Sequence, residues 1–218
     1  MPPMPSRRPA TLDARRRLAA ALVAFPALWA AGAVQAQAAG RLRPTPAQTE
    51  GPFYPVQIPR DHDNDLLRNG DLRAAGGRPG WVEGTLRDVD GRPLADAAVE
   101  IWQCDEAGHY HHPGDGGHAD PGFQGFGRTL ADSEGRWRFR TMAPVPYPGR
   151  TPHIHLKVRS GERELLTTQL YMAGAPGNAR DFLWRNLSEA DRAALTLAFE
   201  PAGNEEWRAS FPVVVART

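Results

Sequence analysis

Short segments in which apolar and polar residues alternate, each bounded by a turn sequence, constrain the fold of this chain more than any other feature. Residues 81–88 read WVEGTLRD and residues 136–141 read RWRFRT, with the turn sequences DGRP at residues 90–93 and SEG at residues 133–135. Alternation with a period of two is typical of a β-strand with one buried face. The 22 glycines and 21 prolines of the 218 residues also favour many turns over long helices.

Further segments complete a predicted all-β fold. Strands are expected over residues 97–104, 154–158, 165–172 and 211–216. One short C-terminal helix is expected over residues 189–199, because Ser188 followed by Asp191 has the spacing of a capping box. Several short strands separated by turns predict a β-sandwich with Greek-key-like topology.

The N-terminal residues have the order of a signal peptide. Arginines at positions 15–17 precede an apolar run over residues 18–34, and the small-residue series AQA follows at residues 36–38. The run is short and contains Pro26, so we expect no stable membrane span. The pattern predicts a signal peptide over residues 1–38, favours the twin-arginine route over an ordinary secretory signal, and predicts a periplasmic or secreted protein. Residues 39–80 are expected to form an extended arm, and residues 81–218 the sandwich that carries the candidate site.

Charge and cysteine content exclude two classes of protein. The 26 basic and 25 acidic residues nearly balance, which gives no electrostatic footprint for nucleic acid. The single cysteine, Cys104, rules out an internal disulfide. Because Cys104 lies beside Trp102 in an expected strand, we predict that it is a small buried core residue.

Residues 143–158, APVPYPGRTPHIHLKV, contain the strongest chemical signal. On a strand, His153 and His155 would point to the same face, and two neighbouring imidazoles form half of a metal site. Tyr147 lies just upstream, and Tyr110 follows an earlier expected strand. Phenolate is a hard anionic donor, so two tyrosines with two histidines suit ferric iron better than zinc. A free tyrosine has a pKa of about 10, so only a strongly charged cation would deprotonate it at neutral pH.

Five segments resemble the intradiol ring-cleavage dioxygenases, especially those of the protocatechuate 3,4-dioxygenase type. They occur in the expected order through most of residues 39–218. The segments are residues 45–55 (TPAQTEGPFYP), 101–110 (IWQCDEAGHY), 125–141 (GFGRTLADSEGRWRFRT), 146–158 (PYPGRTPHIHLKV) and 167–172 (TTQLYM). The combination of two tyrosines, an arginine and the HIH sequence is far more specific than HIH alone.

The resemblance implies an iron cofactor, Fe3+, and a catecholic substrate that reacts with O2. The implied iron ligands are Tyr110, Tyr147, His153 and His155. Arg150 and Gln169 would bind the substrate and act in catalysis, Tyr147 would also act in catalysis after leaving the iron, and Thr49 would line the substrate site. Both atoms of O2 would enter between the two hydroxylated carbons, which gives a cis,cis-muconate-type dicarboxylate.

The chain also departs from the protocatechuate enzymes. Only residues 148–152 separate Tyr147 from His153, where those enzymes carry a longer insert with a tryptophan, and Gly149 stands where bulk is expected. We therefore expect a more open pocket wall. One chain carries both the arm of the iron-free subunit and the ligands of the iron subunit, so a homo-oligomer is expected rather than a heterodimer.

Two alternatives remain open on the sequence alone. Residues 88–102, DVDGRPLADAAVEIW, resemble the prealbumin-like sandwich, which also occurs in non-catalytic binding modules. Such a module would have no use for two tyrosines, two histidines and an arginine in register. A zinc hydrolase would use His153 and His155 with a carboxylate such as Asp105 or Asp115, and would stay colourless.

Overall fold

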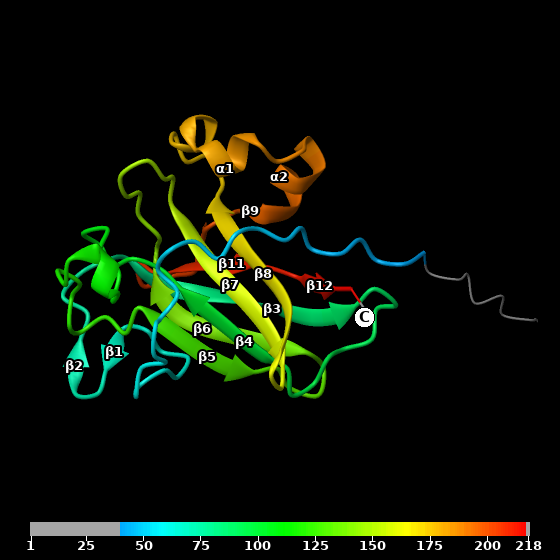
Figure 1. Ribbon diagram of the computed structural model, residues 1–218, viewed down its shortest axis with the longest axis horizontal. Coiled ribbons are helices and arrows are strands. Elements are labelled where there is room, and N and C mark those ends of the chain that lie inside the picture. Colours follow the sequence, from blue (N-terminus) through cyan, green and yellow to red (C-terminus); the bar gives the residue numbers. More distant parts are fainter. Residues whose placement is uncertain (1–39, 217–218) are drawn as a thin grey trace, which may run out of the picture. The chain divides into compact units, whose positions relative to one another are not determined.

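The computed structural model describes residues 40–216, so the predicted signal peptide over residues 1–38 lies outside the described residues. Within the described part, most of the regular structure is β-sheet, arranged as two five-stranded sheets and one small hairpin (Figure 1). This confirms the predicted all-β fold. No helix among residues 40–216 is long and apolar enough to cross a membrane.

The first sheet is built around the long strand β3. Its order is β10-β11-β3-β12, and β6 pairs with β3. The strands are β3 (Pro79–Asp88), β6 (Arg136–Met142), β10 (Glu200–Pro201), β11 (Trp207–Ser210) and β12 (Val213–Val215). β6 runs antiparallel to β3, whereas β11 and β12 run parallel to it.

The second sheet has the order β5-β4-β7-β8-β9. Its strands are β4 (Ala98–Trp102), β5 (Phe126–Leu130), β7 (His153–Ser160), β8 (Arg163–Met172) and β9 (Thr196–Leu197). β4, β5, β7 and β8 pair antiparallel, and β9 pairs parallel with β8. The separate hairpin consists of β1 (Arg68–Asn69) and β2 (Leu72–Arg73).

The hydrophobic core contains side chains from both sheets. The first sheet contributes Val82, Leu86 and Phe139, and the second sheet contributes residues that include Ile154 and Leu156 of β7. Because side chains alternate between the two faces of a strand, the residues between them in β7 point away from this core. We call that side the outer face of the second sheet, and β7 places both histidines of the HIH sequence there.

The helices differ from the prediction in number and length. α2 (Glu189–Leu195) begins as predicted, with the Ser188 hydroxyl accepting a hydrogen bond from the Asp191 N–H at 3.1 Å. It ends before residue 199 because Thr196–Leu197 pair with β8 as β9. A second helix, α1 (Phe182–Arg185), precedes it, so the prediction of a single helix was wrong. Two 3-10 turns cover Pro113–Asp115 and Asn178–Arg180.

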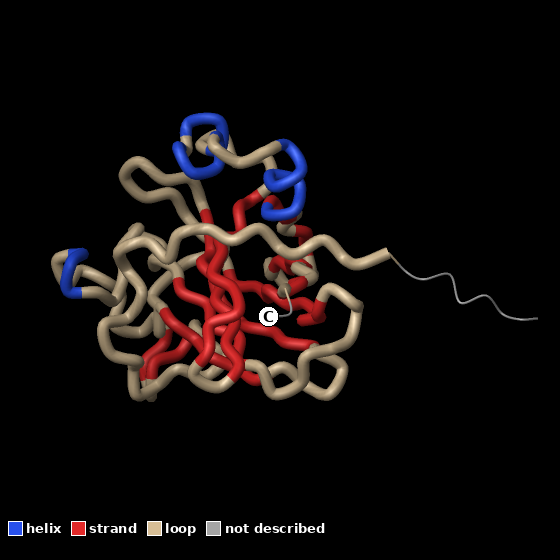
Figure 2. The backbone as a smooth tube through the Cα atoms, turned by 45° about the vertical axis from the view of Figure 1, so that its right-hand side comes forward, coloured by secondary structure: helices blue, strands red, loops and turns tan. Residues whose placement is uncertain are grey.

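Residues 40–56 form an irregular segment that runs past β12 of the first sheet, where the Thr45 N–H donates to the Val214 carbonyl at 2.8 Å, and then over the outer face of the second sheet. In Figure 1 this segment crosses β7 and β8, and Figure 2 shows it as a loop in front of the strands. The Gln48 N–H donates to the Thr167 carbonyl at 2.8 Å, and the Thr168 hydroxyl donates to the Pro46 carbonyl at 2.7 Å. These bonds attach the segment to β8 directly beside the face that carries the histidines.

Candidate metal centre

The four predicted ligands lie together on the outer face of the second sheet, and their rings form a closed cycle. The distances between ring centroids are 5.6 Å for Tyr110 and Tyr147, 5.5 Å for Tyr147 and His153, 4.8 Å for His153 and His155, and 6.2 Å for His155 and Tyr110. The histidines come from β7, Tyr147 from the turn before it, and Tyr110 from the loop after β4. Residues that are far apart in sequence therefore converge on one point.

The two histidines are held so that the same nitrogen of each faces the other. Their side chains are buried, and the two Nε2 atoms lie 3.2 Å apart. His153 Nδ1 donates to the Thr151 carbonyl at 2.7 Å, which leaves the lone pair of His153 on Nε2. The His155 ring stacks on Trp102 at 4.6 Å, its cross-strand neighbour in β4. Two nitrogens at this separation suit a shared metal ion at about 2.1 Å from each.

Tyr110 is the more deeply buried of the two tyrosines. Its backbone N–H donates to the Asp115 carboxylate at 2.7 Å, and its ring stacks on Phe53 with centroids 4.6 Å apart. The Tyr110 hydroxyl is buried and has no hydrogen-bond partner among the described residues. Leaving a buried hydroxyl unpaired costs about 1–3 kcal/mol, so this oxygen is suited to bind a cation.

A tight turn places Tyr147 and Arg150 on the same side of the chain. The Arg150 N–H donates to the Tyr147 carbonyl at 2.9 Å, and Gly149 between them has a φ of 81°. A proline followed by a glycine at positive φ is the pattern of a type II turn, which Pro148 and Gly149 satisfy. A side chain on Gly149 would meet nothing within 4 Å. The turn is therefore open at Gly149, and Tyr147 itself is half-buried.

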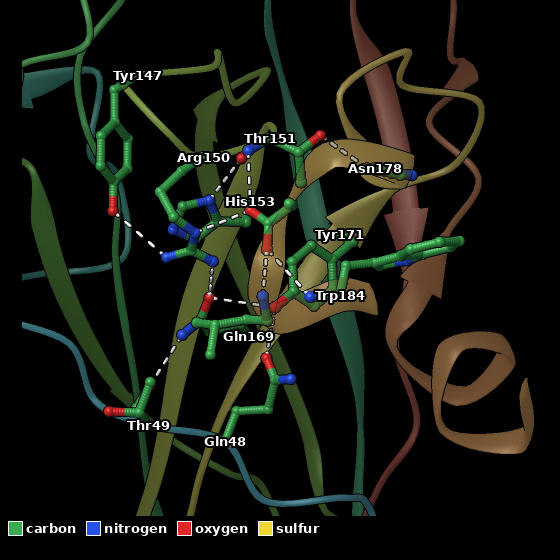
Figure 3. Close-up of polar contacts among 12 residues, drawn as sticks. Gln48, Thr49, Tyr147, Arg150, Thr151, His153, Gln169, Tyr171, Asn178 and Trp184 are labelled. Atoms are coloured by element: carbon green, nitrogen blue, oxygen red, sulfur yellow. Dashed lines mark hydrogen bonds and ion pairs between the residues drawn. The ribbon is translucent and has the colours of Figure 1, made fainter. Parts of the chain in front are cut away.

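The guanidinium of Arg150 connects the remaining predicted site residues (Figure 3). Its Nη1 donates to the Tyr147 hydroxyl at 3.4 Å, and its Nη2 donates to Gln169 Oε1 at 2.6 Å. Gln169 Nε2 in turn donates to the Thr49 carbonyl at 2.9 Å. Thr49 thus meets this network through its backbone, while its exposed side chain accepts the Gly51 N–H at 3.3 Å. The structure brings all seven predicted site residues into one region.

Burial keeps all four ring side chains uncharged at neutral pH when no cation is present. Burial, followed by the charge of Arg150, lowers the pKa of His153 to about 3. Burial and the neighbouring His153 lower the pKa of His155 well below its ordinary value. Burial likewise raises the pKa of the Tyr110 and Tyr147 phenols above the ordinary tyrosine value. Only a strongly charged cation would turn these phenols into phenolates at neutral pH. The donor set therefore fits a trivalent metal ion.

These shifts predict how the stability of the iron-free protein depends on pH. The unfolded chain protonates histidine near pH 6.5, whereas folded His153 stays neutral down to about pH 3. The contribution of neutral, buried His153 to the free energy of unfolding is therefore complete above pH 6.5, and it is lost as the pH falls towards 3. His153 should lower the free energy of unfolding by up to about 1.4 kcal/mol per pH unit in this window, and His155, whose pKa is also lowered by burial, should add to the loss. Urea unfolding at several pH values measures the slope.

Matched histidine variants separate this effect from other titrating groups. His118 lies exposed in the loop that follows Tyr110, so a His118→Gln variant should keep the full slope. A His153→Gln, His155→Gln double variant should have a shallower slope between pH 6 and 4. Equal slopes in the two variants would show that the two buried histidines do not control this pH dependence.

Several residues of the site had not been identified from the sequence. Trp102 was expected only as core, but its ring also covers His155. Asp181 accepts a hydrogen bond from Arg150 Nε at 2.8 Å. Its only sequence signal is its place before the short apolar stretch FLW, which indicates a helix N-cap rather than a site. Phe53 stacks on Tyr110, and Gln48 accepts from the Tyr171 hydroxyl at 2.6 Å.

Lys157 holds residues 48–54 over the site through contacts with Glu50 and Tyr54. Its side chain is only 4% exposed, forms an ion pair with Glu50, and lies 3.3 Å from the Glu164 carboxylate. Its Nζ lies 3.9 Å from the ring centroid of Tyr54. Lys157 follows His155 by two residues in β7, so the strand that presents the histidines also holds the segment that covers them.

Replacing Lys157 by methionine should loosen this segment without leaving a buried charge. Methionine retains the apolar stem, and both Glu50 and Glu164 are at least 43% exposed. We expect cleavage after Glu50 by a glutamate-specific protease to become several-fold faster. An Arg159→Met variant, changed two residues further along the same strand, is the control and should be cleaved at the wild-type rate. Equal cleavage of both variants would contradict the role of Lys157.

In the described part of the chain, the two carboxylates considered for a zinc hydrolase, Asp105 and Asp115, are engaged in other contacts. Asp105 accepts hydrogen bonds from the backbone N–H groups of Ala107, His109 and Asp120. Asp115 accepts from the Tyr110 N–H and contacts His109 Nδ1. Across residues 40–216, no group of three or more histidine, cysteine, aspartate or glutamate side chains is placed to hold a metal ion.

The predicted burial of Cys104 is confirmed.

Comparison with known proteins gives one consistent result. A family model described as Dioxygenase matches residues 49–209. A hydroxyquinol 1,2-dioxygenase of Rhodococcus opacus is 30% identical over 194 residues, which cover 76% of this chain and 62% of that protein. The protocatechuate 3,4-dioxygenase beta chain of Burkholderia cepacia is 37% identical over 165 residues, which cover 69% of this chain and 68% of the other. The chain thus spans about three fifths of the length of the hydroxyquinol relative.

Solved structures with the same fold include further dioxygenases. The dioxygenase domain of a dioxygenase and carbohydrate-binding fusion from Streptomyces sp. SirexAA-E is 31% identical, with a TM-score of 0.65. The match covers 81% of this chain and 100% of that domain. Catechol 1,2-dioxygenase from Acinetobacter sp. ADP1 is 27% identical with a TM-score of 0.62, over 79% of this chain and 63% of the other.

Proposed function

We propose that this chain, which belongs to the intradiol ring-cleavage dioxygenase family, is a non-haem Fe(III) enzyme that cleaves a catecholic ring. Both atoms of O2 would enter between the two hydroxylated carbons, and the product would be a cis,cis-muconate-type dicarboxylate. The observation that carries the proposal is the closed cycle of two tyrosine and two histidine rings with Arg150 beside it.

The iron would be held by His153 and His155 through Nε2 and by Tyr110 and Tyr147 through their phenol oxygens. When bound, ferric iron would make a chelated catechol ring electron-rich and open to attack by O2. Trp102 stacks on His155 and Phe53 stacks on Tyr110, and these contacts shield the two donor rings from water.

Tyr147 is the ligand best placed to take a proton from the substrate. It is half-buried, whereas Tyr110 is buried, and it begins a turn whose residues 148–149 are exposed. Burial favours the protonated phenol, so a Tyr147 phenolate released from a cation would readily accept a proton at its oxygen. The nearby Arg150 guanidinium keeps its charge and can hydrogen-bond that oxygen before and after the transfer.

Arg150 and Gln169 would act on the ring of the substrate. A guanidinium cannot be deprotonated in a protein, so Arg150 supplies a permanent positive charge for the negative charge that develops on the ring. Gln169 Oε1 accepts a hydrogen bond from Arg150 Nη2, and Gln169 Nε2 donates to the Thr49 carbonyl. The orientation of the amide is therefore set before the substrate binds.

Oxygen uptake with a panel of catechols tests this proposal. The purified protein, loaded with iron, should consume O2 with catechol, hydroxyquinol or a ring-substituted catechol. With 18O2, both labelled atoms should appear in a dicarboxylate product. Protocatechuate should be a poorer substrate than catechols without a carboxylate, because this chain lacks the insert that the protocatechuate enzymes carry between the positions of Tyr147 and His153. An iron-loaded protein that turns over none of these compounds, or a product with one labelled atom, would refute the proposal.

Export, assembly and detailed topology are further parts of the proposal. The arginine-rich and apolar order of residues 1–38 supports a signal peptide and a periplasmic or secreted protein. Fractionation of cells followed by mass analysis of the N-terminus tests this. We also propose a homo-oligomer, which light scattering would detect, and a prealbumin-like Greek-key sandwich. The two sheets with a shared core support the sandwich.

A further inference from the structure

Asp181 is a buried carboxylate next to the site with no part in the proposed chemistry. It lies directly before α1, and its side chain is 0% exposed. Its Oδ1 accepts the N–H groups of Leu183 and Trp184 at 2.9 and 3.0 Å. Its Oδ2 accepts the Thr151 N–H at 3.0 Å and Arg150 Nε at 2.8 Å. An ionised carboxylate has about four acceptor positions, and here four donors fill them, so its orientation is fixed.

The contact with Asp181 determines the direction in which Arg150 points. An arginine stem is flexible, but the guanidinium is planar, so a bond to Nε fixes the direction of both terminal nitrogens. In this structure those nitrogens meet the Tyr147 hydroxyl and Gln169 (Figure 3). The Phe182 ring centroid lies 5.7 Å from the guanidinium carbon and limits its movement further. Without Asp181, only the contacts at the terminal nitrogens and the Phe182 ring would orient the group.

The segment that carries Asp181 is attached to the second sheet at several points. Trp184 Nε1 donates to the hydroxyl of Thr196, the first residue of β9, at 3.2 Å. Asn178 accepts from the Thr151 hydroxyl at 2.7 Å and donates to the Met172 carbonyl at 2.9 Å. Residues 178–185 therefore form a fixed support rather than a loose loop. The support is joined to the residues just before β7 and to the end of β8.

We propose that Asp181 is a positioning residue that holds the guanidinium of Arg150 in the direction from which it faces Tyr147 and the substrate. This inference rests on the proposed function. Asp181 does not touch the reacting atoms and acts through Arg150. Its two carboxylate oxygens have different roles. Oδ1 caps the N-terminus of α1, and Oδ2 binds Arg150 Nε.

An Asp181→Ser variant separates these two tasks. Serine is a favourable N-cap residue, so α1 retains its start, whereas the shorter side chain does not reach Arg150. A Ser188→Ala variant, which removes the cap of α2, is the matched control for a purely structural effect. We expect kcat to fall about tenfold to a hundredfold in Asp181→Ser, a range typical for a misplaced catalytic group. KM, iron content and visible colour should change little, and Ser188→Ala should retain kcat within about twofold.

A double-mutant cycle shows whether Asp181 acts through Arg150. In an Arg150→Met background the Asp181→Ser change should alter kcat less than about twofold, because the group to be positioned is gone. An equal loss in both backgrounds would overturn the proposal. So would a wild-type kcat in the single Asp181→Ser variant, or an equal loss in Ser188→Ala.

A readout without catalysis separates a failure of this inference from a failure of the proposed function. In protein loaded with diamagnetic gallium(III), the Arg150 Nε–H should give an NMR signal that exchanges slowly with water. The signal should persist in Ser188→Ala and exchange rapidly in Asp181→Ser. If the wild-type protein cleaves no catechol, the proposed function fails, and this exchange measurement alone decides whether Asp181 holds Arg150. An Arg150 signal that is unchanged in Asp181→Ser would refute the positioning role.

Discussion

A His155→Leu variant is expected to lose its bound iron and the proposed ring cleavage together. His155 is only 1% exposed and presents Nε2 at 3.2 Å from that of His153. Leucine fills much of the same space against Trp102 but has no lone pair. Loss of a partner that only orients a metal ligand lowers metal affinity by about 10–100-fold. Loss of the ligand itself should lower it by more, so metal analysis should find little iron.

The control for this variant is another histidine of the same chain. His118 lies exposed in the loop after Tyr110, so His118→Leu should retain iron and activity. Thermal unfolding of both variants shows whether the fold is preserved. A folded His155→Leu protein with a full equivalent of iron would contradict the assignment of the metal centre to this cycle of rings.

Replacing Arg150 by methionine is expected to abolish most of the activity while leaving the iron in place. Methionine approximates the length of the apolar stem but has neither charge nor donors. Removing one positioned donor from a developing negative charge lowers kcat by about 10²–10³, or about 2.7–4 kcal/mol. Iron content and the visible band should be retained, because Arg150 is not among the four ring donors. Steady-state kinetics and the visible spectrum of the same sample measure both effects.

A lysine at position 150 refines the test. Lysine retains the positive charge but lacks the planar fork that meets Asp181, Tyr147 and Gln169 at once. Its kcat should lie between those of the wild type and Arg150→Met. Arg138→Met, a change on the exposed side of β6, should retain wild-type kinetics. The account of Arg150 would be wrong if Arg150→Met kept kcat within threefold of the wild type.

The strand pattern and the local arrangement of the site could be predicted from the sequence for a physical reason. In β7 the alternation of HIHLKV places the histidines on one face and Ile154 and Leu156 on the other, and the structure confirms it. The turn from Tyr147 to Arg150 also depends on neighbouring residues only, since Pro148 and Gly149 are suited to it. Local rules therefore account for three of the four ligands and for the arginine.

Long-range pairing could not be predicted from patterns alone. Tyr110 reaches the site because β4 pairs with β7, with Trp102 opposite His155, and alternation does not say which strands are neighbours. Donor chemistry suggested Tyr110 as a partner of the histidines, but only the resemblance to a known family linked Gln169 to them. The role of Asp181 could not be predicted because α1 spans only Phe182–Arg185, and so short a helix shows no helical period in the sequence. The end of α2 was misplaced because pairing of Thr196–Leu197 with β8 overrides the helical preference of that stretch.

The visible absorption spectrum of the iron-loaded protein, before and after anaerobic addition of catechol, tests the central claim most directly. Two tyrosinates on ferric iron should give a red-brown charge-transfer band. The band should move to longer wavelength when catechol binds the metal and Tyr147 is released. A protein that stays colourless after iron loading, and unchanged by catechol, would contradict the assignment of Tyr110, Tyr147, His153 and His155 as an iron site.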